Sequence, residues 1–206
     1  LNSLSFFTDN FLPNIYLPNL MAVKSWDSKT NTIIYDRNIF DEASNEWVRN
    51  FDFPQTLIPS AQERFEDFKD DFIEVTTNKK TGFISIAINH QSPYISKDWV
   101  ELIVKELNYF SISKDKAKAI SAIEYLNEQM VKTRFTEVKE VIAELLQKKI
   151  QELTLMEASD FYVLEYIDPP VVMEEKSEPS RIIIVSLGLF TGFILGIMLV
   201  LFRKYF

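Results

Sequence analysis

An uninterrupted apolar stretch near the end of the chain limits most strongly what the chain can fold into. Residues 182–202 read IIIVSLGLFTGFILGIMLVLF, without a charge or a proline, and their only polar side chains are Ser186 and Thr191. A helix that crosses a bilayer needs about 20 apolar residues and satisfies its own backbone hydrogen bonds. A chain of 206 residues has little core in which to bury such a segment on every side. We therefore expect a transmembrane helix here.

Glycine is concentrated in this apolar segment. Three of the four glycines in the chain, Gly188, Gly192 and Gly196, lie there at a spacing of four residues. This spacing places them on one face of a helix, where missing side chains let a second helix approach closely. Glycine is frequent in membrane helices in general, but three in tandem favour a helix-packing face.

Charge and composition exclude some partners and leave the compartment open. The formal net charge of -8 argues against nucleic acid, which is bound by clustered Lys and Arg. The chain has no Cys, which excludes disulfides and thiolate metal sites.

Basic residues flank the apolar segment equally, so they do not orient it: Lys176, Arg181, Arg203 and Lys204. Nothing near Leu1 resembles a signal peptide, and we expect a further segment upstream.

The first part of the chain carries signals for a small α/β base. Ser60 and Glu63 have the spacing of a capping box, which predicts that a helix begins there. Strands are predicted at 72–77 and 83–89, joined by the polar loop 78–82, and a β-rich run at 162–167 is able to return to this sheet. We assign residues 1–95 and 159–180 to the base.

A long helical hairpin is predicted for residues 96–158. The segment between Pro93 and Pro169 contains neither Gly nor Pro, the two strongest helix breakers. We expect one helix from Ser96, as its cap, to about Lys132, and a returning helix that begins near Thr136. At 1.5 Å per residue the first helix is about 55 Å long, more than a compact domain of this size covers. The hairpin should therefore project from the base.

Apolar residues form stripes on both predicted helices. The first helix carries two nearly opposite stripes, Trp99, Ile103, Leu107 and Phe110 and then Ala119, Ile123, Leu126 and Met130, while the returning helix carries Val138, Ile142, Leu146, Ile150 and Leu153. Ile123, Leu126 and Met130 face either the returning helix or a neighbouring subunit, and we take them as candidate oligomer contacts. An ordinary buried pair of helices is the alternative.

Prolines separate the hairpin from the apolar segment. Pro169, Pro170 and Pro179 prevent a helix from continuing, and we expect an extended, membrane-proximal collar that delivers the chain to residues 181–206. The predicted fold class is therefore α+β: a membrane-proximal α/β base with a projecting long helical hairpin, followed by a C-terminal transmembrane helix.

The sequence carries no recognisable catalytic motif. It has no glycine-rich phosphate loop, no nucleophile motif and no metal-ligand spacing, and its one histidine, His90, is more readily structural. We expect no enzyme activity, cofactor or metal. Clustered carboxylates, Asp70, Asp71 and Glu74, leave open a membrane-anchored glycan hydrolase, although a solvated helix face explains them better. A membrane-tethered interaction protein is a further alternative.

Several segments resemble the bacterial polysaccharide chain-length determinants, the Wzz-type polysaccharide co-polymerases. The resemblance is carried by LMAVKSWD from Leu20, KKTGFISIAINHQSP from Lys79, KDWVELIVKELN from Lys97, YLNEQM from Tyr125, and YVLEYIDPPVVMEEKSEPSR with GLFTGFILG from Tyr162 to Gly196. The chain departs from the family at Met173, where many members carry a second Pro, and at Ser180, which interrupts the usual Pro-Lys-Arg. The family's first transmembrane helix and leading strand are also absent.

The resemblance implies a location and a role. It places the protein in the bacterial inner membrane, with the base and hairpin in the periplasm and a short cytoplasmic tail after the last helix. It implies a ring-shaped homo-oligomer that sets the modal length of a polysaccharide such as O-antigen, made by a separate polymerase. The implied partners are further copies of the chain, that polymerase, the growing lipid-linked polysaccharide and the bilayer.

Overall fold

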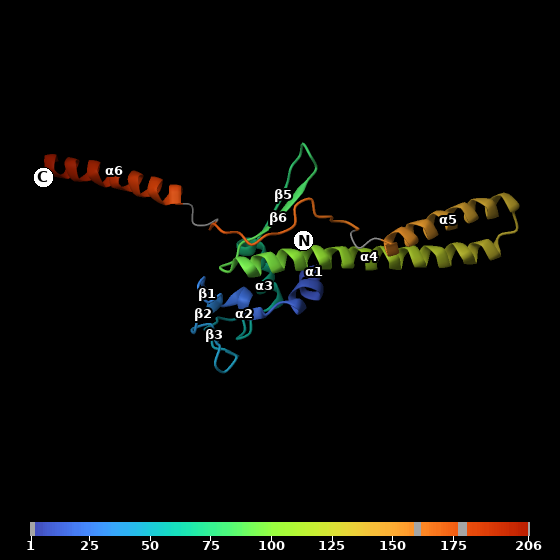
Figure 1. The fold of residues 1–206 in the computed structure, drawn as a ribbon, viewed down its shortest axis with the longest axis horizontal. Coiled ribbons are helices and arrows are strands. Elements are labelled where there is room, and N and C mark those ends of the chain that lie inside the picture. Colours follow the sequence, from blue (N-terminus) through green and yellow to red (C-terminus); the bar gives the residue numbers. More distant parts are fainter. Residues whose placement is uncertain (1–2, 159–161, 177–180, 206) are drawn as a thin grey trace. The chain divides into compact units, whose positions relative to one another are not determined.

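The computed structural model describes residues 3–158, 162–176 and 181–205. The chain divides into two compact units, Leu1–Val172 and Met173–Phe206. The first unit combines helices with small antiparallel sheets and contains a long helical hairpin (Figure 1). The α+β class and the hairpin predicted from the sequence are therefore confirmed.

The amino-terminal part of the base consists of short helical pieces. They are α1 (Leu4–Phe6), the π-helical turn η1 (Phe7–Phe11), the 3-10 turn η2 (Leu12–Asn14) and α2 (Leu17–Met21). Pro13 and Pro18 each stand in the first turn of a piece, where the missing proline N–H is tolerated. The phenylalanines of this segment, Phe6, Phe7 and Phe11, precede both prolines and lie on α1 and η1.

Three two-stranded antiparallel sheets are found in the described part of the base. They pair β1 (Val23–Asp27) with β2 (Thr32–Tyr35), β3 (Phe40–Asp41) with β4 (Glu46–Trp47), and β5 (Ile73–Thr77) with β6 (Ile84–Ile88). The β5–β6 hairpin is the one predicted from the sequence. Its loop closes through a hydrogen bond from the Gly82 N–H to the Asn78 carbonyl, with Gly82 at a φ of 75°.

The predicted helix start at Ser60 is confirmed. Helix α3 (Ala61–Asp67) begins directly after it, and the Ser60 hydroxyl accepts a hydrogen bond from the Glu63 N–H at 3.2 Å. A π-helical turn, η3 (Phe68–Phe72), continues α3 and leads into β5.

The hairpin consists of α4 (Pro93–Lys132) and α5 (Thr136–Ala158). With 40 residues, α4 is about 60 Å long at 1.5 Å per residue. It begins three residues before the predicted start, so Ser96 is not its cap. Ser92 is the N-cap residue and Pro93 occupies the first turn, a position that suits its fixed φ. The Ser96 hydroxyl instead donates to the Ser92 carbonyl at 3.2 Å.

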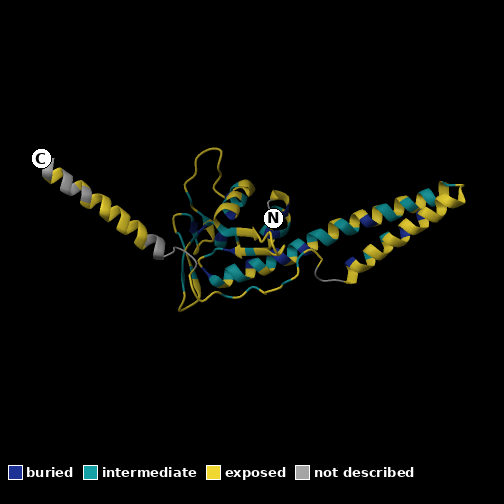
Figure 2. Ribbon diagram, turned by 90° about the horizontal axis from the view of Figure 1, so that it is seen from above, coloured by how far each residue is buried: buried dark blue, intermediate teal, exposed yellow. Residues whose placement is uncertain are grey.

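The main core lies where the first turns of α4 meet the base. Trp99 and Ile103, from the predicted first stripe of α4, are buried there among aromatic side chains, and the Phe110 ring meets that of Phe6 at 5.8 Å. The buried cluster consists of Phe7, Phe11, Leu20, Phe68, Ile88, Trp99 and Ile103. Figure 2 shows that buried residues become sparse along the hairpin, so this core stabilises the base.

The inward face of α5 differs from the predicted stripe. Ile142 and Leu146 are buried, as predicted, but Val138 and Ile150 are exposed and Met156 is buried. A step of four residues turns a helix by about 400°, so a stripe built from steps of four drifts by about 40° at each step. Alternating steps of four and three keep to one face, as in a coiled coil.

The β-rich run at 162–167 forms no strand. Residues 162–168, called the strap below, return from the hairpin without regular secondary structure. In Figure 1 the strap runs beside α4. The expectation that this segment returns to the sheet is wrong. The backbone of residues 162–164 hydrogen-bonds to the Asn108 side chain of α4, and no strand pairs with this segment within the described residues.

In the described residues of the second unit, 173–176 and 181–205, one helix is found, α6 (Arg181–Tyr205). No helix within the described part of the chain combines the length and apolar character that crossing a membrane requires. The predicted span, 182–202, falls partly on side chains outside the described ones. The structure thus confirms a helix here and not the membrane span. A Cβ atom built at Gly188, Gly192 or Gly196 meets nothing within 4 Å, and the packing role of this face stays a prediction.

The collar is described only in part. Residues 169–176 lack helix and strand, in agreement with the two prolines at its start, Pro169 and Pro170. Pro179 lies outside the described residues. The boundary between the two compact units falls between Val172 and Met173, within the predicted collar.

Candidate functional site

The exposed side of α5 carries an apolar face, of which the predicted stripe includes only Val138. Val138, Val141 and Leu145, called the outer face below, are each 44 to 57% exposed. Their spacing of three and four residues places them on one side of the helix. This spacing is visible in the sequence and could have predicted the face. The predicted inward stripe of the returning helix contains only Val138 of the three. A row of exposed apolar side chains is a candidate contact surface.

The three predicted oligomer contacts lie on the other helix of the hairpin. Ile123, Leu126 and Met130 on α4 are each partly buried. Helices α4 and α5 pack along each other in this region, so the three residues do not form a freely exposed surface like the outer face. Their role between subunits stays a prediction.

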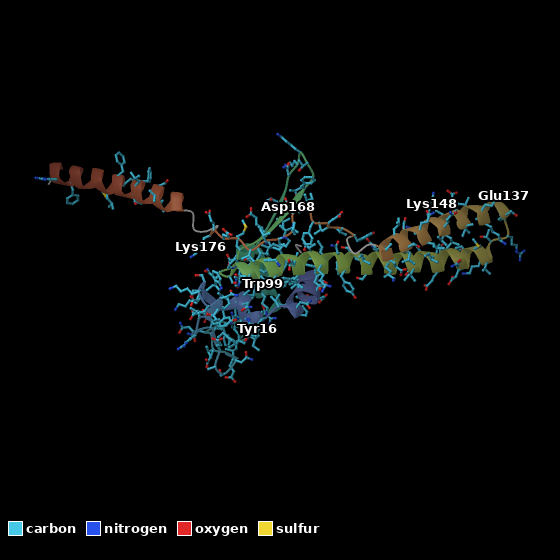
Figure 3. The ribbon with its side chains drawn as sticks, viewed as in Figure 1. Tyr16, Trp99, Glu137, Lys148, Asp168 and Lys176 are labelled. Atoms are coloured by element: carbon cyan, nitrogen blue, oxygen red, sulfur yellow. The ribbon has the colours of Figure 1, made fainter. Side chains whose placement is uncertain are left out.

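Ion pairs along the hairpin lie mostly within one helix. Lys148 and Glu144 on α5 meet at 3.2 Å, and Figure 3 shows Lys148 and Glu137 on the projecting part of this helix. The pair from Lys116 on α4 to Glu157 on α5, at 2.5 Å, joins the two helices. All four paired side chains are well exposed, and such pairs contribute about 0 to 1 kcal/mol. These exposed pairs therefore contribute little to the stability of the hairpin.

A cavity of about 370 Å³ lies at the open end of the hairpin. Its lining is Asp115, Lys118, Ala119, Ala122, Lys149, Glu152, Met156 and Tyr162. The alanines leave space that larger side chains would fill. The charged groups at its rim already pair with each other, Lys118 with Asp115 at 2.9 Å and Lys149 with Glu152 at 2.6 Å.

The acidic cluster named in the sequence is a surface feature. Asp70 and Asp71 on η3 and Glu74 on β5 are exposed, and Asp70 lies 3.5 Å from the Lys69 ammonium. Burial raises the pKa of Asp67, and the neighbouring charges of Glu63 and Asp71 raise it further. Among the described residues, no three His, Cys, Asp or Glu side chains are placed to hold a metal ion. That the chain has no catalytic activity stays a prediction.

His90 joins two elements of the base. Its Nδ1 accepts a hydrogen bond from the Ser92 N–H at 2.9 Å, so Nε2 carries the proton and donates to the Asn19 carbonyl, also at 2.9 Å. The ring packs against Trp99 at 5.2 Å. Burial lowers the pKa of His90, which favours the neutral ring. This geometry agrees with a structural role.

Comparison with protein families gives one match. Residues 128–205 match the family model GNVR, described as a G-rich domain on putative tyrosine kinase. The matched segment begins in the last turns of α4 and includes α5, the strap and α6. No curated protein and no solved structure matches the chain. The carboxyl-terminal part of the chain therefore carries a domain typical of the Wzz/Wzc chain-length determinant proteins, the polysaccharide co-polymerase family.

Proposed function

We propose that this protein sets the length of a bacterial polysaccharide, of the O-antigen or lipopolysaccharide type. It acts without catalytic activity, as a self-assembling co-polymerase beside a separate polymerase that makes the glycan. The observation that carries the proposal is the family match over 128–205, which coincides with the returning helix of a projecting hairpin. Only the first turns of α4 lie in the core of the base, at Trp99 and Ile103. The rest of the hairpin has surface on which other molecules can bind.

The proposed location is the bacterial inner membrane, with the base and hairpin in the periplasm. Proteins with this domain are typically membrane-associated. The uncharged sequence of residues 182–202 supports an anchor at α6. Gly188, Gly192 and Gly196 then provide a face on which anchors of neighbouring subunits pack.

The proposed assembly is a ring of identical subunits that contact each other through their hairpins. The outer face supports this proposal, because Val138, Val141 and Leu145 are exposed within a helix that is otherwise well supplied with charge. A neighbouring hairpin that covers the outer face would remove this apolar surface from water. The growing lipid-linked polysaccharide and its polymerase then meet an assembly and not a single chain.

A charge-insertion variant tests the assembly and the function together. Val141→Glu with Leu145→Glu places two carboxylates on the outer face, and burying them without partners is disfavoured by several kcal/mol. Gln147→Glu with Gln151→Glu adds the same charges at exposed positions elsewhere on α5 and serves as the matched control. We expect the first variant to lower the native mass of the solubilised assembly and to shift the modal glycan length on a gel.

Two outcomes would contradict the proposal. If both variants keep the wild-type mass and glycan length, the outer face carries no contact between subunits. If deletion of the gene leaves the glycan length distribution unchanged, the protein does not regulate chain length.

A further inference from the structure

One polar side chain is buried inside the longest helix. Asn108 lies in α4, five residues beyond the fully buried Ile103, and is only 3% exposed. A buried amide is disfavoured unless its donors and acceptors find partners. Among the described residues, the hydrogen-bond partners of the Asn108 side chain belong to the strap, more than fifty residues away in the sequence.

Asn108 holds the strap by both ends of its amide. Its Oδ1 accepts from the N–H groups of Val163 at 2.8 Å, Leu164 at 3.0 Å and Tyr162 at 3.3 Å. Its Nδ2 donates to the Leu164 carbonyl at 2.8 Å. Three successive backbone N–H groups thus converge on one oxygen, the concave arrangement that binds negatively polarised atoms. Within the described residues, no strand pairs with this part of the strap.

The strap follows one side of α4 toward the base. Ahead of Asn108, the Tyr162 hydroxyl donates to Asp115 Oδ2 at 3.3 Å. Beyond Asn108, the strap reaches the first turns of α4, where burial and the charge of Glu101 raise the pKa of Tyr166. Glu101, Asn108 and Asp115 are seven residues apart, a spacing of two turns that places them on the same side of a helix. Asn108 is the buried point of this series, whereas the contact at Asp115 is exposed.

We propose that Asn108 is a latch that holds a releasable strap, residues 162–168, against α4. The latch lies beyond the aromatic core, so it opens without disrupting the packing of Trp99 and Ile103. While it is closed, the return of the chain from α5 is tied to α4 at residue 108, next to the contact of Phe110 with Phe6 of the base. From there, residues 111–132 of α4 extend for about 33 Å. Opening releases the return segment from α4, so the hairpin gains freedom to tilt.

Hydrogen exchange measured on the whole chain tests the latch directly. We expect Asn108→Ala to speed exchange of the Val163 and Leu164 amides about 30-fold, equivalent to about 2 kcal/mol at 1.4 kcal/mol per tenfold change. Asn108→Asp keeps an acceptor for the three N–H groups but loses the donor to the Leu164 carbonyl, so its exchange should lie between wild type and Asn108→Ala. Asn127→Ala removes an exposed amide from the same helix and is the control.

The pattern of exchange decides the result. Faster exchange confined to the strap, with amides around Ile103 unchanged, supports the latch. Unchanged exchange at Val163 and Leu164 in Asn108→Ala overturns it, and so does a uniform increase throughout the base. If Asn108→Ala does not fold, wild-type exchange of the strap in Asn108→Asp overturns it equally.

The latch itself does not depend on the proposed function, but its effect on the product does. Measuring glycan length for Asn108→Ala separates the two. A released strap together with an altered modal length supports both proposals. A released strap with unaltered length leaves the latch standing and counts against a role of the hairpin in length control.

Discussion

Arg49 closes the loop between β4 and α3 and is the most informative polar residue to replace in the base. Its guanidinium forms a two-pronged ion pair with Glu63, with Nη2 at 2.9 Å from Oε2, and also donates to the carbonyls of Thr56 and Leu57. The two charged side chains are only 12 and 18% exposed. One planar group therefore links both ends of the loop to the first turn of α3.

The effect of Arg49→Ala follows from this burial. Breaking a fully buried ion pair by removing one partner costs about 3 to 5 kcal/mol, whereas an exposed pair contributes about 0 to 1. The pair from Arg49 to Glu63 lies between these limits, and the exposed carbonyls are rehydrated cheaply. We expect a loss of about 2 to 3 kcal/mol. Arg49→Lys keeps the charge but not the two-pronged geometry, and should lose about 1 kcal/mol.

Urea unfolding of the purified chain measures this loss, followed by tryptophan fluorescence, to which the buried Trp99 contributes. With an m-value of about 2 kcal/mol/M, the midpoint should fall by about 1 to 1.5 M. A double-mutant cycle with Glu63→Gln isolates the pair. Because Arg49 lowers the pKa of Glu63 below its ordinary value of 4.5, its contribution is present above that pH and lost as the pH falls further.

A coupling energy below about 0.5 kcal/mol at pH 7 would refute a stabilising pair between Arg49 and Glu63, since distant, independent sites add within that margin. An equal shift of the midpoint in Arg49→Lys and Arg49→Ala would refute it as well. Either result would mean that the loop is held by its apolar side chains.

Three other perturbations have defined outcomes. Ile103→Ala removes a side chain that is 0% exposed, and the urea assay should show a loss of about 3 to 4 kcal/mol. Acidification should destabilise the base. Burial lowers the pKa of His90, so the stability that depends on its neutral ring is fully present above the ordinary pKa of 6.5. This stability is lost as the pH falls toward the pKa of His90 in the folded chain. His90→Gln should flatten this pH dependence in thermal melts. A Cβ atom added at Gly82 meets no atom within 4 Å, but the backbone there has a φ of 75°, which alanine adopts only with strain. Gly82→Ala should therefore cost about 1 kcal/mol of stability in the urea assay.

Short-range interactions explain why some elements were predictable. The capping box at Ser60 and the loop that ends at Gly82 involve residues three to five positions apart, so their hydrogen bonds are readable from the sequence. The two hairpin helices follow equally from a segment without Gly or Pro. Even here the start of α4 differs from the predicted one at Ser96, because Pro93 does not bound the helix but is its first residue.

The sequence by itself determined which segments become helix or hairpin, because those choices depend on neighbours along the chain. Only the tertiary structure decided which sides are buried. The inward face of α5 depends on how α4 lies against it, which moved Val138 from the predicted core to the outer face. The strap shows the same limit: its residues favour a strand, but Asn108, 54 to 56 residues away, supplies the partners that a strand would have needed. Hydrogen bonds over such separations arise only once the fold has brought the two segments together, so local propensity does not reveal them.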